Sequence, residues 1–212
     1  MPSNIENLLT TGASALGVPL AAPRAESFIR YLDLLLKWNR KVSLTSITDP
    51  KEVVVKHFLD SLALCRLLPD GPFIAADIGA GAGLPGLAVR IARQDMALTA
   101  VEPDHRKAAF IKHVARTLGL GGVTVLEARV ESIGADAGPF DVVFSRAFRE
   151  PARLLPLIGP LMAPGGIAAL SLGPETAMAA PPGWEAARTE EITLPFSRYK
   201  RTLAAYKKSR TP

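Results

Sequence analysis

A glycine-rich loop, DIGAGAGLPG at residues 77–86, follows a short apolar run in the middle of the chain. The apolar run, Phe73–Ile78, is typical of a buried parallel strand, and Leu84–Arg93 after the loop reads as a helix. Glycine allows a tight backbone turn and a close approach that any Cβ would block. The chain therefore contains a strand–loop–helix unit of an α/β sheet, with a loop that a ligand can approach closely.

Short apolar runs continue to alternate with helical patterns after this unit. The further predicted strands are Ala97–Val101, Val123–Leu126, Asp141–Phe144 and Gly166–Leu172, and the further predicted helices are Asp104–Leu118 and Pro151–Met162. This alternation indicates a doubly wound, Rossmann-like α/β sheet. Near the end of the chain, two β-like runs at Thr189–Leu194 and Arg201–Tyr206 flank a turn and predict an antiparallel hairpin.

The residues before the sheet have a helical pattern. In Ala25–Trp38 apolar residues recur at helical spacing. Asp49 and Pro50 are typical of an N-cap and a first helical position. We therefore expect a helical N-terminal extension at residues 1–69, an α/β domain at residues 70–208 and a basic tail at residues 209–212.

Two classes of cofactor use a glycine loop at the end of a strand. The dinucleotide pattern GxGxxG fits Gly81, Gly83 and Gly86. The S-adenosylmethionine pattern, an acid followed by GxGxG, fits Asp77, Gly79, Gly81 and Gly83. A loop that serves only as a structural turn is the third alternative.

The position of the strand end favours the second cofactor. If the strand ends near Ile78, the dinucleotide pattern begins two residues into the loop and gives Asp77 no role. The Asp77 carboxylate could instead pair with the amino group of a methionine moiety. Glu102, at the end of the second predicted strand, is placed to accept hydrogen bonds from ribose hydroxyls, which either cofactor carries. No GxxxxGK sequence is present, so a P-loop is excluded.

The end of the fourth predicted strand bears on the methyl acceptor. Enzymes that methylate exocyclic amines usually carry Asn/Asp-Pro-Pro-aromatic there, whereas residues 145–148 read SRAF. Enzymes that methylate pyrimidine C5 need a cysteine nucleophile, and Cys65 lies outside the α/β region. Both absences fit an acceptor with a free lone pair, such as guanine N7. Catalysis would then rest on positioning and desolvation, so we assign no catalytic base.

Positive charge is concentrated in two places. The chain has 25 Lys and Arg against 20 Asp and Glu, and six of the basic residues follow residue 197, where no acidic residue occurs. A second basic group lies on the predicted helix Asp104–Leu118. Such patches suit polyphosphate partners, although a solvated surface is the alternative. The residues that we predict to contact such a partner are Arg106, Lys107, Arg198, Lys200 and Arg201.

Composition limits the environment of the protein. A single cysteine, Cys65, can form neither an internal disulfide nor a CxxC metal or redox pair. The apolar stretch Leu8–Ala22 has no cation before it, unlike a signal peptide, and no run of 18 strongly apolar residues occurs. We therefore expect a cytoplasmic monomer without a membrane span or a metal ion.

Five motifs occur together in one order: WNRKVSLT at 38–45, HFLDSL at 57–62, DIGAGAGLPG at 77–86, VEPDHRKAAF at 101–110 and SRAF at 145–148. This set is similar to that of the bacterial small-subunit ribosomal RNA guanine-N7 methyltransferases, also called glucose-inhibited division protein B. The resemblance runs from about residue 25 to residue 172. It implies a class I methyltransferase domain, S-adenosyl-L-methionine as cofactor, and one guanine in the decoding-region loop of 16S rRNA as substrate, either free or in the small ribosomal subunit.

The resemblance also implies roles for single residues. Gly79 and Leu84 would line the methionine end of the cofactor, and Val130 with Glu131 would hold the adenine. Arg146 would reach the cofactor or the RNA and could assist the reaction. Each role has a structural alternative: Leu84 as a core residue, Glu131 as an exposed helix start, and Arg146 as a surface ion-pair partner.

Some residues depart from the family or lack an assigned role. The family often has Lys where this chain has Leu172, and Lys200 or Arg201 could supply the missing charge. His57 and Asp60 lie one helical turn apart, and we expect a local hydrogen-bonded pair rather than a metal site, because a third ligand is missing.

Two other functions stay open on the sequence alone. A methyltransferase acting on a small molecule would use the same loop but would leave the basic tail without a role. A nicotinamide-dependent oxidoreductase, or a nucleotide-binding module without catalytic activity, would use the dinucleotide pattern.

Overall fold

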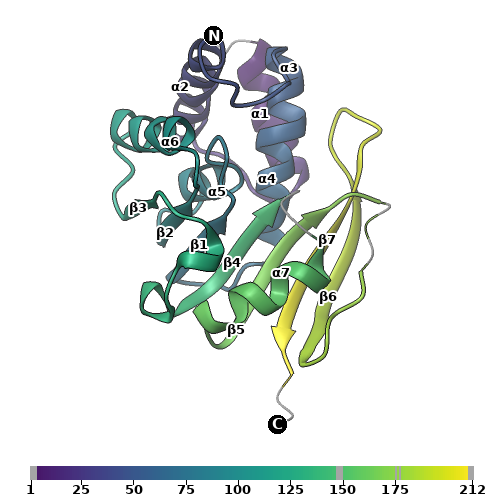
Figure 1. The fold of residues 1–212 in the computed structure, drawn as a ribbon. Coiled ribbons are helices and arrows are strands. Elements are labelled where there is room, and N and C mark those ends of the chain that lie inside the picture. Colours follow the sequence, from purple (N-terminus) through teal and green to yellow (C-terminus); the bar gives the residue numbers. More distant parts are fainter. Residues whose placement is uncertain (1–3, 147–149, 175, 177, 210–212) are drawn as a thin grey trace.

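The centre of the computed structural model, which describes residues 4–146, 150–174, 176 and 178–209, is a seven-stranded sheet (Figure 1). Its strand order is β3-β2-β1-β4-β5-β7-β6. The first five strands are parallel, and β7 is antiparallel to both of its neighbours. The strands are β1 (Phe73–Ile78), β2 (Met96–Val101), β3 (Val123–Leu126), β4 (Phe140–Arg146), β5 (Met162–Leu172), β6 (Trp184–Thr193) and β7 (Lys200–Lys208). The predicted doubly wound sheet with a C-terminal hairpin is confirmed.

Helices cover both faces of the sheet. Helix α7 (Pro151–Ile158) packs on one face, while α5 (Gly86–Ala92) and α6 (His105–Thr117) pack on the other. Neighbouring strand residues therefore enter different cores: Phe144 packs with the α5 side and Val143 with the α7 side. Burial on both faces explains why these strands read as continuous apolar runs in the sequence.

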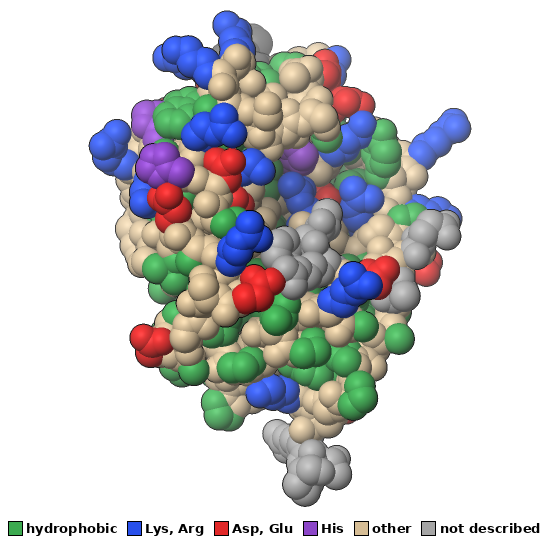
Figure 2. All heavy atoms as spheres, in the orientation of Figure 1, with side chains coloured by type: hydrophobic (Ala, Val, Ile, Leu, Met, Phe, Trp, Pro, Cys, Tyr) green, Lys and Arg blue, Asp and Glu red, His purple; other side chains and the backbone are tan. Residues whose placement is uncertain are grey.

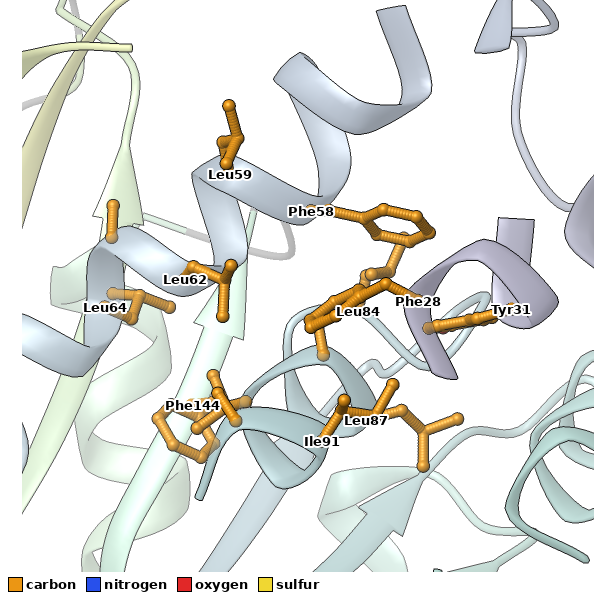
Figure 3. Packing of buried hydrophobic residues seen from close by; sticks show 14 of the residues in the cluster. Phe28, Tyr31, Phe58, Leu59, Leu62, Leu64, Leu84, Leu87, Ile91 and Phe144 are labelled. Atoms are coloured by element: carbon orange, nitrogen blue, oxygen red, sulfur yellow. The ribbon is translucent and has the colours of Figure 1, made fainter. Parts of the chain in front are cut away.

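The N-terminal helices share their core with the α5 face of the sheet. They are α1 (Asn4–Ala15), α2 (Ala22–Asn39), α3 (Pro50–Val53), a π-helical turn at Val54–Leu59, α4 (Asp60–Ala63) and a 3-10 turn at Leu64–Leu67. Figure 3 shows Phe28 and Tyr31 of α2 packed near Phe58 and Leu84. The Phe58 ring centroid lies 5.1 Å from that of Phe28 and 5.3 Å from that of Tyr31. Because each such buried side chain contributes roughly 1.5–3 kcal/mol, this packing fixes the N-terminal helices against the sheet.

Capping residues set several helix ends, and the predicted N-cap Asp49 is one of them. The Asp49 carboxylate accepts a hydrogen bond from the backbone N–H of Glu52 at 2.9 Å, and Pro50 occupies the first helical position. Asp104 caps α6 in the same way, and the chain leaves that helix through Gly119, whose φ is +64°.

The structure differs from the predicted elements mainly at their boundaries. Helix α7 ends at Ile158, four residues before the predicted end, because Pro160 lacks the N–H that would continue it. Strand β6 starts five residues earlier than predicted. Its backbone pairs with β7 from Trp184 onward, but most of its side chains are exposed and so form no apolar run in the sequence. None of the described helices is both long enough and apolar enough to span a membrane.

Candidate functional site

The glycine loop lies at the carboxyl end of β1, and β1 is the strand at which the sheet order reverses. Its neighbours are β2 on one side and β4 on the other. In open α/β sheets, ligands bind outside the carboxyl ends of the strands at such a reversal. The loop predicted from the sequence therefore lies at the place where this fold is built to hold a ligand.

Three glycines in the loop have positive φ angles, which side chains disfavour. The φ angles are +72° at Gly79, +58° at Gly81 and +83° at Gly83. The backbone N–H of Gly79 donates to the carbonyl oxygen of Val101 at 3.0 Å, and that of Gly81 donates to Glu102 Oε2 at 2.8 Å. These bonds tie the loop to the end of β2.

Gly81 and Gly83 have different surroundings. Beyond its chain neighbours, a Cβ built at Gly81 would meet one atom of the described residues within 4 Å, the carbonyl oxygen of Gly79 at 3.9 Å. A Cβ built at Gly83 would lie 2.6 Å from Leu87 Cδ1 and 2.9 Å from the Tyr31 hydroxyl oxygen. Gly83 is thus required for packing, whereas Gly81 presents an open side that a ligand can occupy.

Asp77 lies beneath the loop and is 1% exposed. Its Oδ2 accepts a hydrogen bond from the backbone N–H of Gly86 at 2.7 Å, while its Oδ1 is buried without a hydrogen-bond partner among the described residues. Burial raises the pKa of Asp77 to about 7, partly offset by the Gly86 bond and by the charge of Arg146. The carboxylate therefore braces the loop and keeps one buried oxygen suited to a cationic group.

Glu102 links the loop to α6. Its Oε2 accepts from Gly81, and its Oε1 accepts from the backbone N–H of Asp104 at 2.9 Å. Asp104 in turn accepts from the backbone N–H groups of Arg106 and Lys107, at 2.8 and 3.2 Å. The predicted basic residues Arg106 and Lys107 are thus placed in the first turn of α6, beside the loop.

A narrow hollow and a wide pocket, both lined by described residues, open at this edge of the sheet. A narrow one of about 50 Å³ is lined by the ends of β1 and β2 and by Val130 and Glu131, of which Val130 is buried and Glu131 exposed. A wide pocket of about 580 Å³ lies at the ends of β4 and β5, where its lining includes Arg146 and Leu172. Figure 2 shows that Lys and Arg side chains gather over the upper half of this face, above the carboxyl ends of the parallel strands.

A buried carboxylate organises the wide pocket. Asp60 is 1% exposed, and its Oδ1 accepts from Ser171 Oγ at 2.7 Å. Its Oδ2 accepts from Arg201 Nε at 3.1 Å and lies 3.6 Å from Arg146 Nη1. Two guanidinium groups compensate one buried carboxylate, so the N-terminal helices, β4, β5 and β7 meet at Asp60.

Arg146 also binds the turn before Asp60. Its Nη1 donates to the carbonyl oxygen of Lys56 at 3.2 Å, and its Nη2 lies 3.3 Å from His57 Nδ1. Burial, followed by the charge of Arg146, lowers the pKa of His57 to about 4, so this histidine is neutral at pH 7. Among the described residues, no group of three or more His, Cys, Asp or Glu side chains could hold a metal ion.

The predicted pairing of His57 with Asp60 is wrong. Both side chains turn to Arg146 instead, and His57 Nε2 lies 2.8 Å from Thr45 Oγ1. The helix is π-helical from Val54 to Leu59, so a spacing of three residues no longer places side chains one above the other.

Arg201 is not the surface cation that the charge run predicts. Its side chain is 24% exposed and points to Asp60 in the wall of the wide pocket. It supplies positive charge near Leu172, as predicted, whereas Lys200 is exposed and does not line that pocket. Arg198 is also exposed, in the loop between β6 and β7 at the same edge of the sheet.

Two further predicted roles are qualified by burial. The side chain of Leu84 lies in the core cluster, as the structural alternative proposed, so a role at the cofactor would fall to its backbone. Arg146 is an ion-pair partner, but in the wall of a pocket rather than on the surface. Ala147, Phe148 and residues 210–212 of the predicted tail lie outside the described residues.

Sequence reasoning missed the central position of Asp60. A carboxylate in the apolar stretch HFLDSL was a usable signal, because aspartate is almost never fully buried unless it is paired. Its partners lie 86 and 141 residues further along the chain, so the sequence alone could not name them.

Comparison with known proteins identifies the family. The family model described as GidB, rRNA small subunit methyltransferase G, matches residues 24–177. A relative named ribosomal RNA small subunit methyltransferase G from Myxococcus xanthus is 40% identical over 216 residues, covering 97% of this chain and 98% of the relative. One of the same name from Leptothrix cholodnii is 42% identical over 162 residues, covering 74% and 73%.

A solved structure agrees with the fold. A SAM-dependent methyltransferase from Aquifex aeolicus superposes with a TM-score of 0.57 at 17% identity, covering 77% of this chain and 96% of that one. The family match and the full-length similarity to the Myxococcus relative are sufficient to settle the family. The chain belongs to the family of rRNA small subunit methyltransferase G.

Proposed function

We propose that this protein transfers a methyl group from S-adenosyl-L-methionine to N7 of one guanine in the decoding-region loop of 16S rRNA. The proposal rests above all on the open glycine loop at the sheet reversal, in a chain whose relatives are named ribosomal RNA small subunit methyltransferase G. The basic side chains around this edge suit an RNA substrate, whether free or in the small ribosomal subunit.

The residues around the loop fit the cofactor. The buried Oδ1 of Asp77, which has no hydrogen-bond partner among the described residues, would pair with the amino group of the methionine part. The open side of Gly81 would receive the cofactor backbone. Glu102 would accept from the ribose hydroxyls through its remaining lone pairs. The other proposed cofactor contacts are Gly79, Gly83, the backbone of Leu84, Val130, Glu131 and Arg146.

The wide pocket fits the target base. Its volume of about 580 Å³ lies within the range of small-molecule sites, and it opens at the end of β4, the strand that pairs with β1. When bound, S-adenosyl-L-methionine supplies an electrophilic methyl group on a sulfonium. Guanine N7 would accept this methyl group with its free lone pair, leaving S-adenosylhomocysteine as a neutral thioether. Because N7 has no proton to lose, the chain would need no catalytic base.

The chain's own contribution would be to orient the base and exclude water. Arg146 would orient the base, because Asp60 and the carbonyl oxygen of Lys56 hold its guanidinium in the pocket wall. The helical extension at residues 1–69 would complete that wall for the methyltransferase domain at residues 70–208.

The direct test is to follow labelled methyl transfer to 16S rRNA, intact small subunits and a mixture of small metabolites. We expect label in the RNA or the subunits, and mass spectrometry should place it on N7 of a single guanine. Label confined to the metabolites would favour the small-molecule alternative. Tight binding of NAD, with no response to S-adenosylhomocysteine in calorimetry, would favour the oxidoreductase.

A second prediction concerns the exposed cations at the carboxyl edge. Replacing Arg198 and Lys200 with glutamine should weaken RNA binding and reduce the slope of log affinity against log salt by about one unit per lost phosphate contact. Arg201 is left intact, because removing it would unpair Asp60. Binding is measured by titration at several salt concentrations.

The matched control removes the same charge from the opposite edge. Lys207 and Lys208 are also exposed, but they end β7 at the amino side of the parallel strands. Their replacement with glutamine should leave the salt slope within error of the wild type. If the variant without Arg198 and Lys200 also keeps the wild-type slope, the surface near Arg198 is only solvated.

A further inference from the structure

The loop between β6 and β7, residues 194–199, exposes two aromatic side chains. Phe196 is 57% exposed and Tyr199 is 43% exposed, and the only other exposed large hydrophobic residue among those described is Ile74, near the start of β1. Single exposed apolar residues are ordinary, but two in one six-residue loop beside a candidate site call for an explanation.

The loop holds these rings in a fixed conformation. Phe196 has a φ of +61°, the only positive φ of a described non-glycine residue, and such a conformation costs about 1–3 kcal/mol. The backbone N–H of Leu194 donates to the carbonyl oxygen of Tyr199 at 2.9 Å, and the Ser197 hydroxyl donates to the carbonyl oxygen of Leu194 at 2.9 Å. The strained turn is therefore closed by its own hydrogen bonds.

The N-terminal helices support the underside of the loop. Phe196 Cε2 lies 3.2 Å from the position that a Cβ on Gly12 of α1 would take. Lys56 Nζ lies 4.5 Å from the centroid of the Tyr199 ring and 2.7 Å from Glu52 Oε1. Figure 1 shows the β6–β7 loop standing beside these helices. Because the loop and its rings are already held in place, a ligand could contact them without the cost of ordering the loop.

Tyr199 stands between two hollows. Lys56 and Tyr199 both line the wide pocket proposed for the target base, and both also line a second hollow of about 210 Å³. Phe196 lies on the second hollow. An RNA strand with one base in the wide pocket would therefore pass its next base over these two rings.

Charge around the rings favours a polyanion. Arg198 and Lys200 are exposed, and no carboxylate among the described residues forms an ion pair with either. Lys51 adds a third exposed cation. Among the described residues, the one carboxylate that lines the 210 Å³ hollow is Glu52, which forms an ion pair with Lys56. Aromatic rings among cations are the features by which proteins hold single-stranded RNA.

We infer that Tyr199 and Phe196 form a stacking subsite for the unpaired nucleobase next to the target guanine, with Arg198 and Lys200 on the adjoining phosphates. This inference rests on the proposed function, because it needs an RNA substrate whose target base enters the wide pocket. The proposed subsite adds a contact with a base to a surface at which the sequence predicted only contacts of basic residues.

The test uses the full chain with small ribosomal subunits and labelled S-adenosyl-L-methionine. Tyr199→Leu keeps an apolar side chain but removes the ring, and we expect it to raise KM for the subunits about tenfold. The kcat and the KM for S-adenosyl-L-methionine should stay within about twofold of wild type. Tyr199→Phe keeps the ring and should restore the KM for the subunits. Ile74→Ala, an exposed apolar residue at the opposite edge, is the matched control and should leave both KM values unchanged.

The possible failures are distinguishable. If the wild type methylates subunits and Tyr199→Leu has a normal KM for them, the subsite is refuted while the proposed function stands. An unchanged KM with a lowered kcat refutes the subsite as well, because it assigns Tyr199 to the reaction step. If the wild type transfers no methyl group to subunits or to free 16S rRNA, the proposed function and the subsite both fall.

Discussion

Replacing Gly81 with valine is expected to abolish cofactor binding while the protein stays folded. Among the described residues beyond its chain neighbours, a Cβ at this position meets only the Gly79 carbonyl oxygen, at 3.9 Å. The branched side chain would therefore fill the space proposed for the cofactor. We expect the affinity for S-adenosylhomocysteine to fall at least about 100-fold, equivalent to about 2.7 kcal/mol. Because valine would have to adopt the φ of +58° found at Gly81, the free energy of unfolding should fall by about 1–2 kcal/mol.

Gly119→Val separates these two effects. Gly119 has a φ of +64°, and beyond its chain neighbours no atom of the described residues lies within 4 Å of a Cβ built there. The backbone strain is therefore matched away from the loop. Urea unfolding should show a similar loss of stability in both variants, whereas calorimetry should show normal binding in Gly119→Val. Similar loss of binding in both would mean that general destabilisation is responsible. Gly83 cannot serve for this test, because a side chain there would meet Leu87 and Tyr31 in the core.

The strands of the sheet and their alternation with helices could be predicted because their signals are local. Each buried strand is a short apolar run between turn residues, and the bounds of β1 and β3 agree with those predicted. The predicted N-cap Asp49 likewise acts within three residues of itself. The glycine loop was found for the same reason, since the backbone conformation that it needs is written into consecutive residues.

What could not be predicted depends on residues far apart in the sequence. The charge run at the end of the chain made Arg201 resemble its neighbours Arg198 and Lys200, yet only Arg201 faces a buried carboxylate. That carboxylate, Asp60, requires cationic partners once the helix packs on the sheet, because an unpaired buried charge is costly. Register between β5 and β7 decides which cation reaches it, and a single sequence does not reveal register.

Asp77→Asn is expected to stabilise the free protein at neutral and alkaline pH. Burial raises the pKa of Asp77 to about 7, so the folded protein binds a proton more tightly than the unfolded chain does. The stability that this proton gives is complete below about pH 4 and is lost as the pH rises to about 7. Asparagine is neutral throughout this range. Because each unit of pKa shift is worth roughly 1.4 kcal/mol, the variant should gain up to about 4 kcal/mol over the wild type at pH 8.

Urea unfolding of both proteins between pH 4 and pH 8 measures this gain. The two free energies of unfolding should agree near pH 4 and diverge as the pH rises, so the low-pH values serve as an internal control. A difference that stays constant over this range would contradict a buried carboxylate that charges only with difficulty. A stabilised variant would show that the wild type keeps an unfavourable charge under its glycine loop.

The same variant tests why that charge is kept. If Asp77 Oδ1 accepts a hydrogen bond from the amino group of the cofactor, Asp77→Asn should lower the affinity for S-adenosylhomocysteine about tenfold. This is the loss expected for a hydrogen bond to a charged group. 5′-Methylthioadenosine lacks the amino-acid part, so its affinity should be the same for both proteins. Equal weakening of the two ligands would assign Asp77 to the loop alone, through its bond to Gly86. Weakening confined to S-adenosylhomocysteine would mean that the cofactor's own cation compensates the buried carboxylate.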